Sequence, residues 1–227
     1  MKPEIILALD VDSLERAKYF VNKLYPAVKI FKVGSQLFTA CGPKVIDILN
    51  KKGASVFLDL KFFDIPNTIA HAVRNAIRLK VKMMTLHILG DEEMIKAAVS
   101  AARDESKRLK IKKPLLIGVT VLTSKEARSS DVLTLARIGI ECGLDGIVCS
   151  AREAKFLRQA IKKKFLIVTP GIRPKGAGKN DQRRTATVRE AIQSGSNFLV
   201  VGRPILEARE PLIKAKEILG DIHGRRN

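Results

Sequence analysis

The chain has 227 residues, and its mixture of 46% apolar and 29% charged residues is typical of a globular protein and excludes an intrinsically disordered one. No apolar run approaches the roughly 20 residues of a membrane-spanning helix, and the N-terminus lacks the layout of a signal peptide, so we expect a cytoplasmic protein with no membrane partner. The formal net charge is +19, but the basic residues are dispersed along the sequence and only 5% of residues are aromatic, which does not favour a specific nucleic-acid site.

Short β-rich runs alternate with helical patterns along the whole chain. Most of the strand candidates are continuous apolar runs, as expected for parallel strands that are buried on both faces. In chain order they are Ile5–Leu9, Val28–Val33, Ser55–Leu60, Met83–His87, Leu115–Thr120, Gly146–Cys149, Phe165–Thr169 and Phe198–Val201. The predicted helices are Ser13–Leu24, Pro43–Lys52, Asn67–Leu79, Glu92–Arg108, Val132–Cys142, Ala151–Lys162, Thr187–Ser194 and a last one from Ile205 to about Leu219.

Eight β/α units follow one another without a linker rich in Pro, Gly or Ser. This order predicts an α/β fold, a single (β/α)8 TIM barrel over residues 1–220, with residues 221–227 as a frayed basic tail. The alternative is an open doubly wound sheet. No Gly-x-Gly-x-x-Gly follows any strand, so the pattern favours the barrel.

Polar residues are concentrated where the predicted strands end. The carboxyl ends of all strands of a parallel barrel meet at one mouth, so these groups should converge on a single pocket. They include Asp10, Lys32, Asp59, Lys61, His87, Thr123, Ser150 and the pair Gly202-Arg203.

The segment Asp59-Leu60-Lys61 carries the most specific signal for chemistry. Side chains two residues apart on a strand point the same way, so Asp59 and Lys61 should project together into the mouth. A neighbouring carboxylate favours the charged ammonium, and we therefore expect Lys61 to be a proton donor. The alternative is a surface ion pair, which would contribute little.

A second segment indicates a phosphate site. A loop rich in Gly and Lys runs from Thr169 to Arg183, and the pair Gly202-Arg203 opens the helix after the last strand. Loops after strands seven and eight hold phosphate in many barrels, through backbone N–H groups and guanidinium groups. The alternative is a loop without a ligand and a glycine that only caps a helix.

These motifs, in this order, resemble the orotidine 5′-monophosphate decarboxylase family over about Ile5 to Leu206. The Asp-x-Lys-x-x-Asp core is shared with 3-keto-gulonate-6-phosphate decarboxylase and hexulose-phosphate synthase, and the continuation Ile65-Pro66-Asn67-Thr68 with Gln182 and Arg203 favours the first family. The matching segments are Ala8-Leu9-Asp10, Lys32-Val33-Gly34, Asp59 to Thr68, Val121 to Ser124, Pro170 to Arg173, Asp181-Gln182 and Val201 to Pro204.

The resemblance implies decarboxylation of orotidine 5′-monophosphate (OMP) to UMP and CO2 in pyrimidine biosynthesis, with no metal and no organic cofactor. It implies a homodimer with two shared sites, in which the partner subunit's Asp64 and Thr68 complete each pocket. The implied catalytic residues are Lys61, Asp59, Asp64 and Lys32, and the implied substrate-binding residues are Asp10, Lys32, Thr68, Thr123, Arg173, Gln182, Gly202 and Arg203.

The implied mechanism places Lys61 at the reacting carbon. Loss of CO2 from C6 of the orotate ring leaves a carbanion in the ring plane, which the Lys61 ammonium stabilises and protonates. Phosphate contacts would drive closure of the 174–183 loop. His87 and Ser150 are interpreted as hydrogen-bonded supporting residues. Two rival functions are a sugar-phosphate lyase or decarboxylase and a basic RNA-binding barrel without catalysis.

Overall fold

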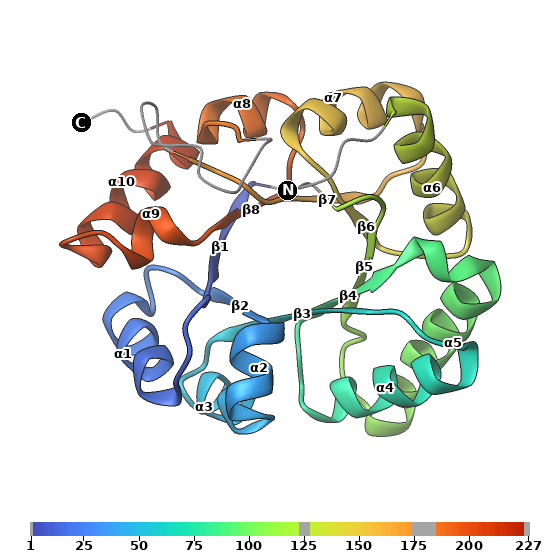
Figure 1. Cartoon of the computed structure of the whole chain (residues 1–227), viewed down its shortest axis with the longest axis horizontal. Coiled ribbons are helices and arrows are strands. Elements are labelled where there is room, and N and C mark those ends of the chain that lie inside the picture. Colours follow the sequence, from blue (N-terminus) through green and yellow to red (C-terminus); the bar gives the residue numbers. More distant parts are fainter. Residues whose placement is uncertain (1, 123–127, 174–184, 225–227) are drawn as a thin grey trace.

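The computed structural model describes residues 2–122, 128–173 and 185–224, and its eight parallel strands close into one barrel in the order β1-β2-β3-β4-β5-β6-β7-β8. Helices surround the ring of strands (Figure 1). The prediction of a single (β/α)8 TIM barrel is therefore confirmed.

The strands lie close to the predicted ranges. They are β1 (Glu4–Ala8), β2 (Ile30–Gly34), β3 (Ser55–Phe62), β4 (Met83–His87), β5 (Leu115–Val119), β6 (Gly146–Val148), β7 (Leu166–Thr169) and β8 (Phe198–Val201). The helices are α1 (Leu14–Leu24), α2 (Ser35–Cys41), α3 (Lys44–Lys51), α4 (Pro66–Arg78), the 3-10 turn η1 (Ile88–Gly90), α5 (Asp91–Leu109), α6 (Ser129–Glu141), α7 (Ala151–Ala160), α8 (Val188–Gln193), α9 (Arg203–Leu206) and α10 (Pro211–His223).

Two helical regions differ from the predictions. Helix α2 was not predicted, because it is short and Leu37 is its one buried residue, so it has no apolar period to detect. The last predicted helix is two helices, α9 and α10, since Pro211 starts a new helix rather than continuing the old one. Helix α10 also runs to His223, inside the segment assigned to a frayed tail, and Ile222 is buried.

The apolar core has two parts, separated by the barrel wall. Side chains alternate along a strand, so Ile5 and Leu7 of β1 face the helices while Ile6 and Ala8 face the barrel axis. The interior is filled by Ile6, Ala8, Ile30, Phe57, Met83, Ile117, Val168, Phe198 and Val200. Because the interior is packed, a ligand can be held only at an end of the barrel.

The connections from each helix to the next strand lie at the amino ends of the strands, the end opposite the mouth. They carry Lys29, Lys52, Lys80, Lys82, Lys110, Lys112, Lys113, Lys162, Lys163 and Lys164, and we call this surface the lysine face. Asp145 is the one acidic residue of these connections, and its Oδ2 lies 2.6 Å from Lys113 Nζ. Lysines at helix C-termini also interact favourably with the helix dipoles.

Three further features bear on function. Within the described ranges, no helix is both long enough and apolar enough to cross a bilayer. In the same ranges, no group of three or more His, Cys, Asp and Glu side chains could hold a metal ion. Cys41, Cys142 and Cys149 are free thiols, and burial raises the pKa of the Cys149 thiol, which makes it unreactive.

Candidate active site

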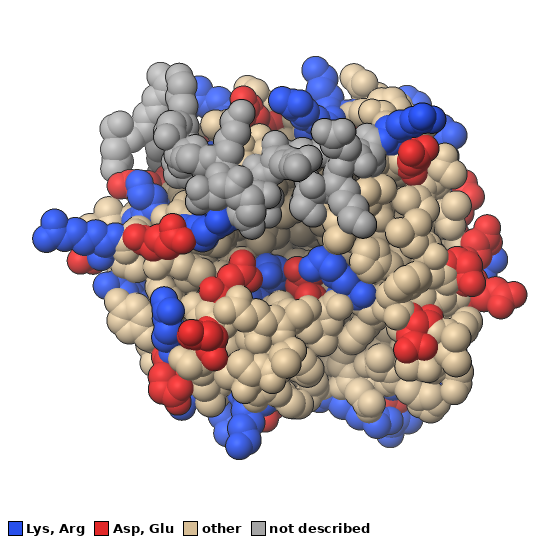
Figure 2. Space-filling model, viewed as in Figure 1, with Lys and Arg blue, Asp and Glu red and all other residues tan. Residues whose placement is uncertain are grey.

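A cavity of about 250 Å³ opens at the carboxyl ends of the strands. Acidic and basic side chains lie together in this hollow (Figure 2). Its floor is apolar, formed by Ala8, Phe57, Val119, Val148, Val168 and Val200. The predicted convergence of strand ends therefore produces a pocket with an apolar floor and charged walls.

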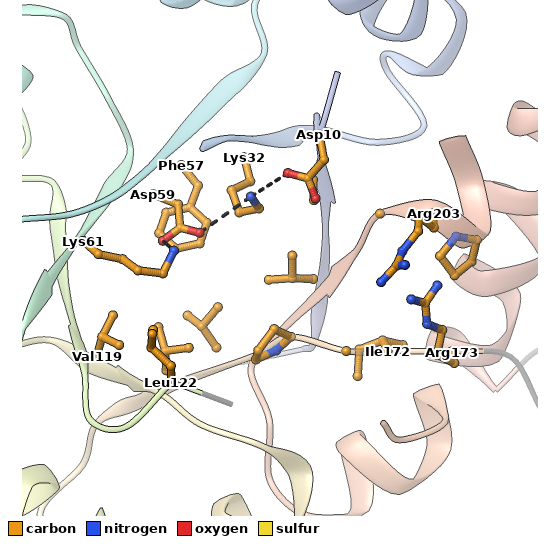
Figure 3. A pocket seen from close by; sticks show the side chains of 18 of the residues that line it. Asp10, Lys32, Phe57, Asp59, Lys61, Val119, Leu122, Ile172, Arg173 and Arg203 are labelled. Carbon is orange, nitrogen blue, oxygen red and sulfur yellow. Dashed lines mark hydrogen bonds and ion pairs between the residues drawn. The ribbon is translucent and has the colours of Figure 1, made fainter. Parts of the chain in front are cut away.

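One wall is a row of four alternating charges, Asp10, Lys32, Asp59 and Lys61, which we call the charge row (Figure 3). Lys32 Nζ lies 3.0 Å from Asp10 Oδ1 and 3.6 Å from Asp59 Oδ2. Lys61 Nζ lies 3.0 Å from Asp59 Oδ1. The Asp59 side chain is only 14% exposed, so this row is more than a surface ion pair.

The register of the strands brings the row together. Lys32 of β2 pairs with Phe57 of β3, and Gly34 pairs with Asp59, so side chains from both strands enter the same layer of the barrel. A Cβ atom on Gly34 would lie 3.0 Å from Lys32 Nζ. Glycine at this position therefore leaves the space that the Lys32 ammonium occupies.

Lys61 has an unusual backbone. Its φ is 51°, in the left-handed region, and the β3–β4 register is irregular between Leu58 and Phe62. Such a conformation costs a non-glycine residue about 1–3 kcal/mol and is common at functional sites. Asp59 and Lys61 project together into the pocket as expected, but a bulge rather than the regular repeat of a strand places them there.

The charges of the row shift the pKa values of its neighbours. Burial alone would raise the pKa of the Asp59 carboxyl, but Lys32 and Lys61, with hydrogen bonds from Lys61 and Thr85, hold this pKa below its usual value. Burial and the nearby Lys61 ammonium lower the pKa of His87, partly opposed by Asp59. At neutral pH, Asp59 is therefore charged and His87 is neutral.

The opposite wall carries two guanidinium groups, from Arg173 after β7 and Arg203 at the start of α9 (Figure 3). Arg173 is 8% exposed, and its backbone N–H donates to the Ala186 carbonyl at 2.9 Å. Gly202 lines the pocket and precedes α9. Two guanidinium groups beside a helix start are suited to a phosphate dianion. Two further predicted contacts, Thr123 and Gln182, lie outside the described residues.

Asp64 and Thr68 do not join the charge row of their own chain. Both are exposed, neither lines the pocket, and Asp64 Oδ1 accepts a hydrogen bond from the Ile65 N–H at 2.7 Å. Asp64 lines a surface hollow together with Phe63, Ile65 and Leu89, whose side chains are 60%, 65% and 59% exposed. The chain alone therefore leaves these two predicted site residues outside its pocket.

A family model described as "Orotidine 5'-phosphate decarboxylase / HUMPS family" matches residues 3–218. The chain belongs to this family.

Individual members of the orotidine 5′-phosphate decarboxylase / HUMPS family cover almost the same length. A Vibrio cholerae protein named orotidine 5′-phosphate decarboxylase is 46% identical, over 95% of this chain and 96% of its own. One of the same name from Syntrophomonas wolfei is 44% identical, over 96% and 97%. The crystal structure of orotidine 5′-phosphate decarboxylase from Lactobacillus acidophilus is 35% identical with a TM-score of 0.86, over 97% of this chain and 99% of that one.

Sequence reasoning missed or misjudged three residues around the pocket. Thr85 is fully buried and hydrogen-bonded to both Asp59 and Lys61, and its position two residues before His87 on the same strand face was the available signal. Ser150 was expected to be a supporting residue, and it caps α7 in a capping box with Glu153. His87 was expected to be hydrogen-bonded, but its buried Nδ1 has no hydrogen-bond partner within the described part of the chain.

Proposed function

We propose that this protein is an orotidine 5′-monophosphate decarboxylase, a carboxy-lyase that converts OMP to UMP and CO2. The single observation that carries the proposal is one pocket with the charge row on one wall and the Arg173 and Arg203 guanidinium groups on the other. Relatives from Vibrio cholerae, Syntrophomonas wolfei and Moorella thermoacetica, 42–46% identical over nearly the full length, are named orotidine 5′-phosphate decarboxylase, which supports the same activity here. We place this reaction in pyrimidine biosynthesis and the enzyme in the cytoplasm.

Lys61 performs the central step. The bond from C6 to the carboxylate breaks, CO2 leaves, and the electron pair stays on C6 in the plane of the ring. The Lys61 ammonium stabilises this carbanion and then gives it a proton, forming the C6–H bond and leaving a neutral amine that solvent reprotonates. Asp59, 3.0 Å from Lys61 Nζ, holds the ammonium in place before the reaction. Lys61 supplies both charge and proton, so this mechanism uses no metal or organic cofactor.

The rest of the pocket holds the substrate. Asp10 and Lys32 bind the ribose hydroxyl groups, and Arg173, Gly202 and Arg203 bind the phosphate. The resemblance further assigns Thr123 to the pyrimidine and Gln182 to the phosphate, and both of these residues lie outside the described ranges. Phosphate contacts far from C6 provide binding energy that can be used at the reacting carbon. The loop closure expected to accompany these contacts involves residues 174–183, which lie outside the described residues.

The active form is a homodimer with two shared sites. The exposed side chains of Phe63, Ile65 and Leu89 form an apolar surface that a partner subunit would cover. Asp64 lies on this surface and Thr68 is exposed in the first turn of α4, so an isologous contact would carry both toward the partner's pocket. The partner subunit's Asp64 then extends the charge row beyond Lys61.

The decisive test follows the absorbance of the orotate ring after OMP is added to the purified protein without added metal. The band should decay with the parent protein and persist with Lys61→Ala, which removes the proton donor, while circular dichroism shows both proteins folded. A Lys61→Ala rate within tenfold of the parent would mean that Lys61 is not essential. A parent that leaves OMP unchanged but cleaves or decarboxylates a sugar phosphate would favour the rival enzyme of the same family.

A further inference from the structure

Thr85 lies behind the charge row, on β4, and has no exposed surface. Its Oγ1 accepts a hydrogen bond from the Lys61 backbone N–H at 2.9 Å and donates one to Asp59 Oδ1 at 2.9 Å. Asp59 Oδ1 in turn accepts from Lys61 Nζ at 3.0 Å. These three hydrogen bonds form a closed circuit that begins at the backbone of Lys61 and ends at its own ammonium group.

The circuit compensates for an interruption of the β-ladder. Leu58 pairs with Met84 and Phe62 with Leu86, so the three residues from Asp59 to Lys61 face Thr85 alone. In this bulge Lys61 adopts its left-handed conformation, and its N–H is bonded to a side chain instead of a strand carbonyl. The Thr85 hydroxyl thus takes the place of a ladder acceptor for Lys61.

The direction of each hydrogen bond is determined. A backbone N–H can only donate, so the Thr85 hydroxyl accepts from Lys61 and its single proton is left for Asp59. Asp59 Oδ1 then receives Thr85 and Lys61, while Oδ2 faces Lys32 at 3.6 Å. The plane of the carboxylate is fixed from three sides.

We propose that Thr85 is a positioning residue for decarboxylation, which sets the Lys61 ammonium and the Asp59 carboxylate in their reactive arrangement. The proposal rests on the function proposed above. Thr85 does not line the pocket, so it acts through Asp59 and Lys61 and not by touching substrate. A displaced ammonium would miss C6, and misplacement by about 1 Å can cost 100-fold in rate.

The test compares Thr85→Val, which keeps the shape and removes the hydroxyl, with Thr85→Ser, which retains it. For Val, kcat should fall about 10- to 100-fold while KM changes less, because the lost arrangement matters mainly in the transition state. Ser should recover most of the lost kcat. The matched control is Thr120→Val on the neighbouring strand end, whose buried hydroxyl has no hydrogen-bond partner among the described residues and should be dispensable.

A second readout needs no substrate. The groups that face Asp59 are Lys32 from β2, Lys61 from β3, and Thr85 and His87 from β4. Removing the Thr85 hydroxyl takes away a hydrogen bond to the charged carboxylate, so the pKa of Asp59 should rise in Thr85→Val and stay unchanged in Thr85→Ser. Carbon-13 NMR of labelled aspartate, assigned with Asp59→Asn, measures this pKa.

An Asp59 titration that is the same in Thr85→Val and in the parent would overturn the proposal, even if OMP proved not to be the substrate. A Thr85→Val kcat equal to that of the parent would overturn it as well. If Thr85→Val does not fold, Thr85→Cys replaces it in both measurements, since a thiol is a weak donor.

Discussion

Arg203 belongs to the phosphate wall of the pocket, where its guanidinium faces the cavity beside that of Arg173 (Figure 3). We expect Arg203→Ala to raise KM strongly and to lower kcat/KM, because a charge-assisted contact to the phosphate dianion is lost. The decrease in kcat/KM should correspond to a loss of roughly 2–4 kcal/mol of transition-state stabilisation. Steady-state decarboxylation of OMP measures this change. Arg209→Ala, an exposed arginine that does not line the pocket, serves as the charge-matched control. Equal losses from both variants would show that the effect is one of general charge.

The residues of the charge row could be predicted from the sequence, but the backbone conformation that brings Lys61 into the row could not. Asp10, Lys32, Asp59 and Lys61 each stand at or near a strand end, and a parallel barrel brings all strand ends to one mouth. The left-handed backbone of Lys61 has no signal in the sequence, because nothing local requires it and the bulge forms only when β3 meets β4. The roles of Asp64 and Thr68 came from family resemblance alone, since one chain places them outside its own pocket.

At the scale of elements, Glu105 joins α4 to α5. Its carboxylate is 5% exposed and accepts hydrogen bonds from Arg78 Nε at 2.8 Å and from Arg108 Nη2 at 2.7 Å. These hydrogen bonds lower the pKa of Glu105 from 4.5 to about 2. A carboxyl with a lowered pKa stabilises the fold above pH 4.5, and this contribution is lost as the pH falls toward about 2.

We therefore expect Glu105→Gln to lower the urea midpoint at pH 7 and to weaken the pH dependence of that midpoint between pH 4.5 and about 2. Urea unfolding followed by circular dichroism at a series of pH values gives both quantities. Glu92→Gln is the control, because Glu92 and Lys96 form an exposed pair that should contribute little. If the urea midpoint of Glu105→Gln fell with decreasing pH as steeply as that of the parent, other carboxyl groups would be responsible for the acid sensitivity.

The elements themselves were largely predictable, and the exceptions have physical reasons. Eight apolar runs became eight strands, because parallel strands buried on both faces are recognisable by composition alone. Helix α2 escaped prediction because Leu37 is the one residue that it buries, and the interruption before Pro211 was overlooked within an otherwise helical pattern. Long amphipathic elements can thus be predicted from sequence, whereas short connecting helices depend on their surroundings.

At the scale of the whole molecule, shared sites make a quantitative prediction. Homodimers of Lys61→Ala and of Asp64→Ala should each be nearly inactive, because both residues are proposed to be essential. Mixing the two variants should restore activity if Asp64 acts across the interface. After mixing and re-equilibration, about half of the dimers should be mixed, and each has one site with both lesions and one with neither. Activity should return to about a quarter of the parent value.

The OMP absorbance assay after subunit exchange measures the recovery. Exchange is first established with one variant carrying an affinity tag, and re-mixed Lys61→Ala alone is the control that must stay inactive. If exchange occurs and no activity returns, then Asp64 and Lys61 belong to the same site, and the cross-subunit assignment is wrong.

The distribution of charge could not be predicted from the order of residues. The basic residues look dispersed along the sequence, but the barrel topology gathers ten lysines into the lysine face, because every second connection lies at the same end. Only a folded chain brings Lys29 and Lys164 to one surface. Much of the net charge of +19 therefore lies away from the site.

Because the interior of the barrel is packed, the active site opens at the mouth of the barrel and not through its axis. Ile6 and Phe198, at most 1% exposed, fill the axis beneath the pocket floor, so CO2 and UMP must depart on the side where OMP arrived. In the proposed mechanism, a newly formed CO2 molecule would therefore remain beside the carbanion for as long as the mouth is occupied. In the proposed mechanism, the outcome would then depend on the relative rates of recombination with CO2 and of proton transfer, and a Lys61 ammonium held in place by Asp59 would favour proton transfer.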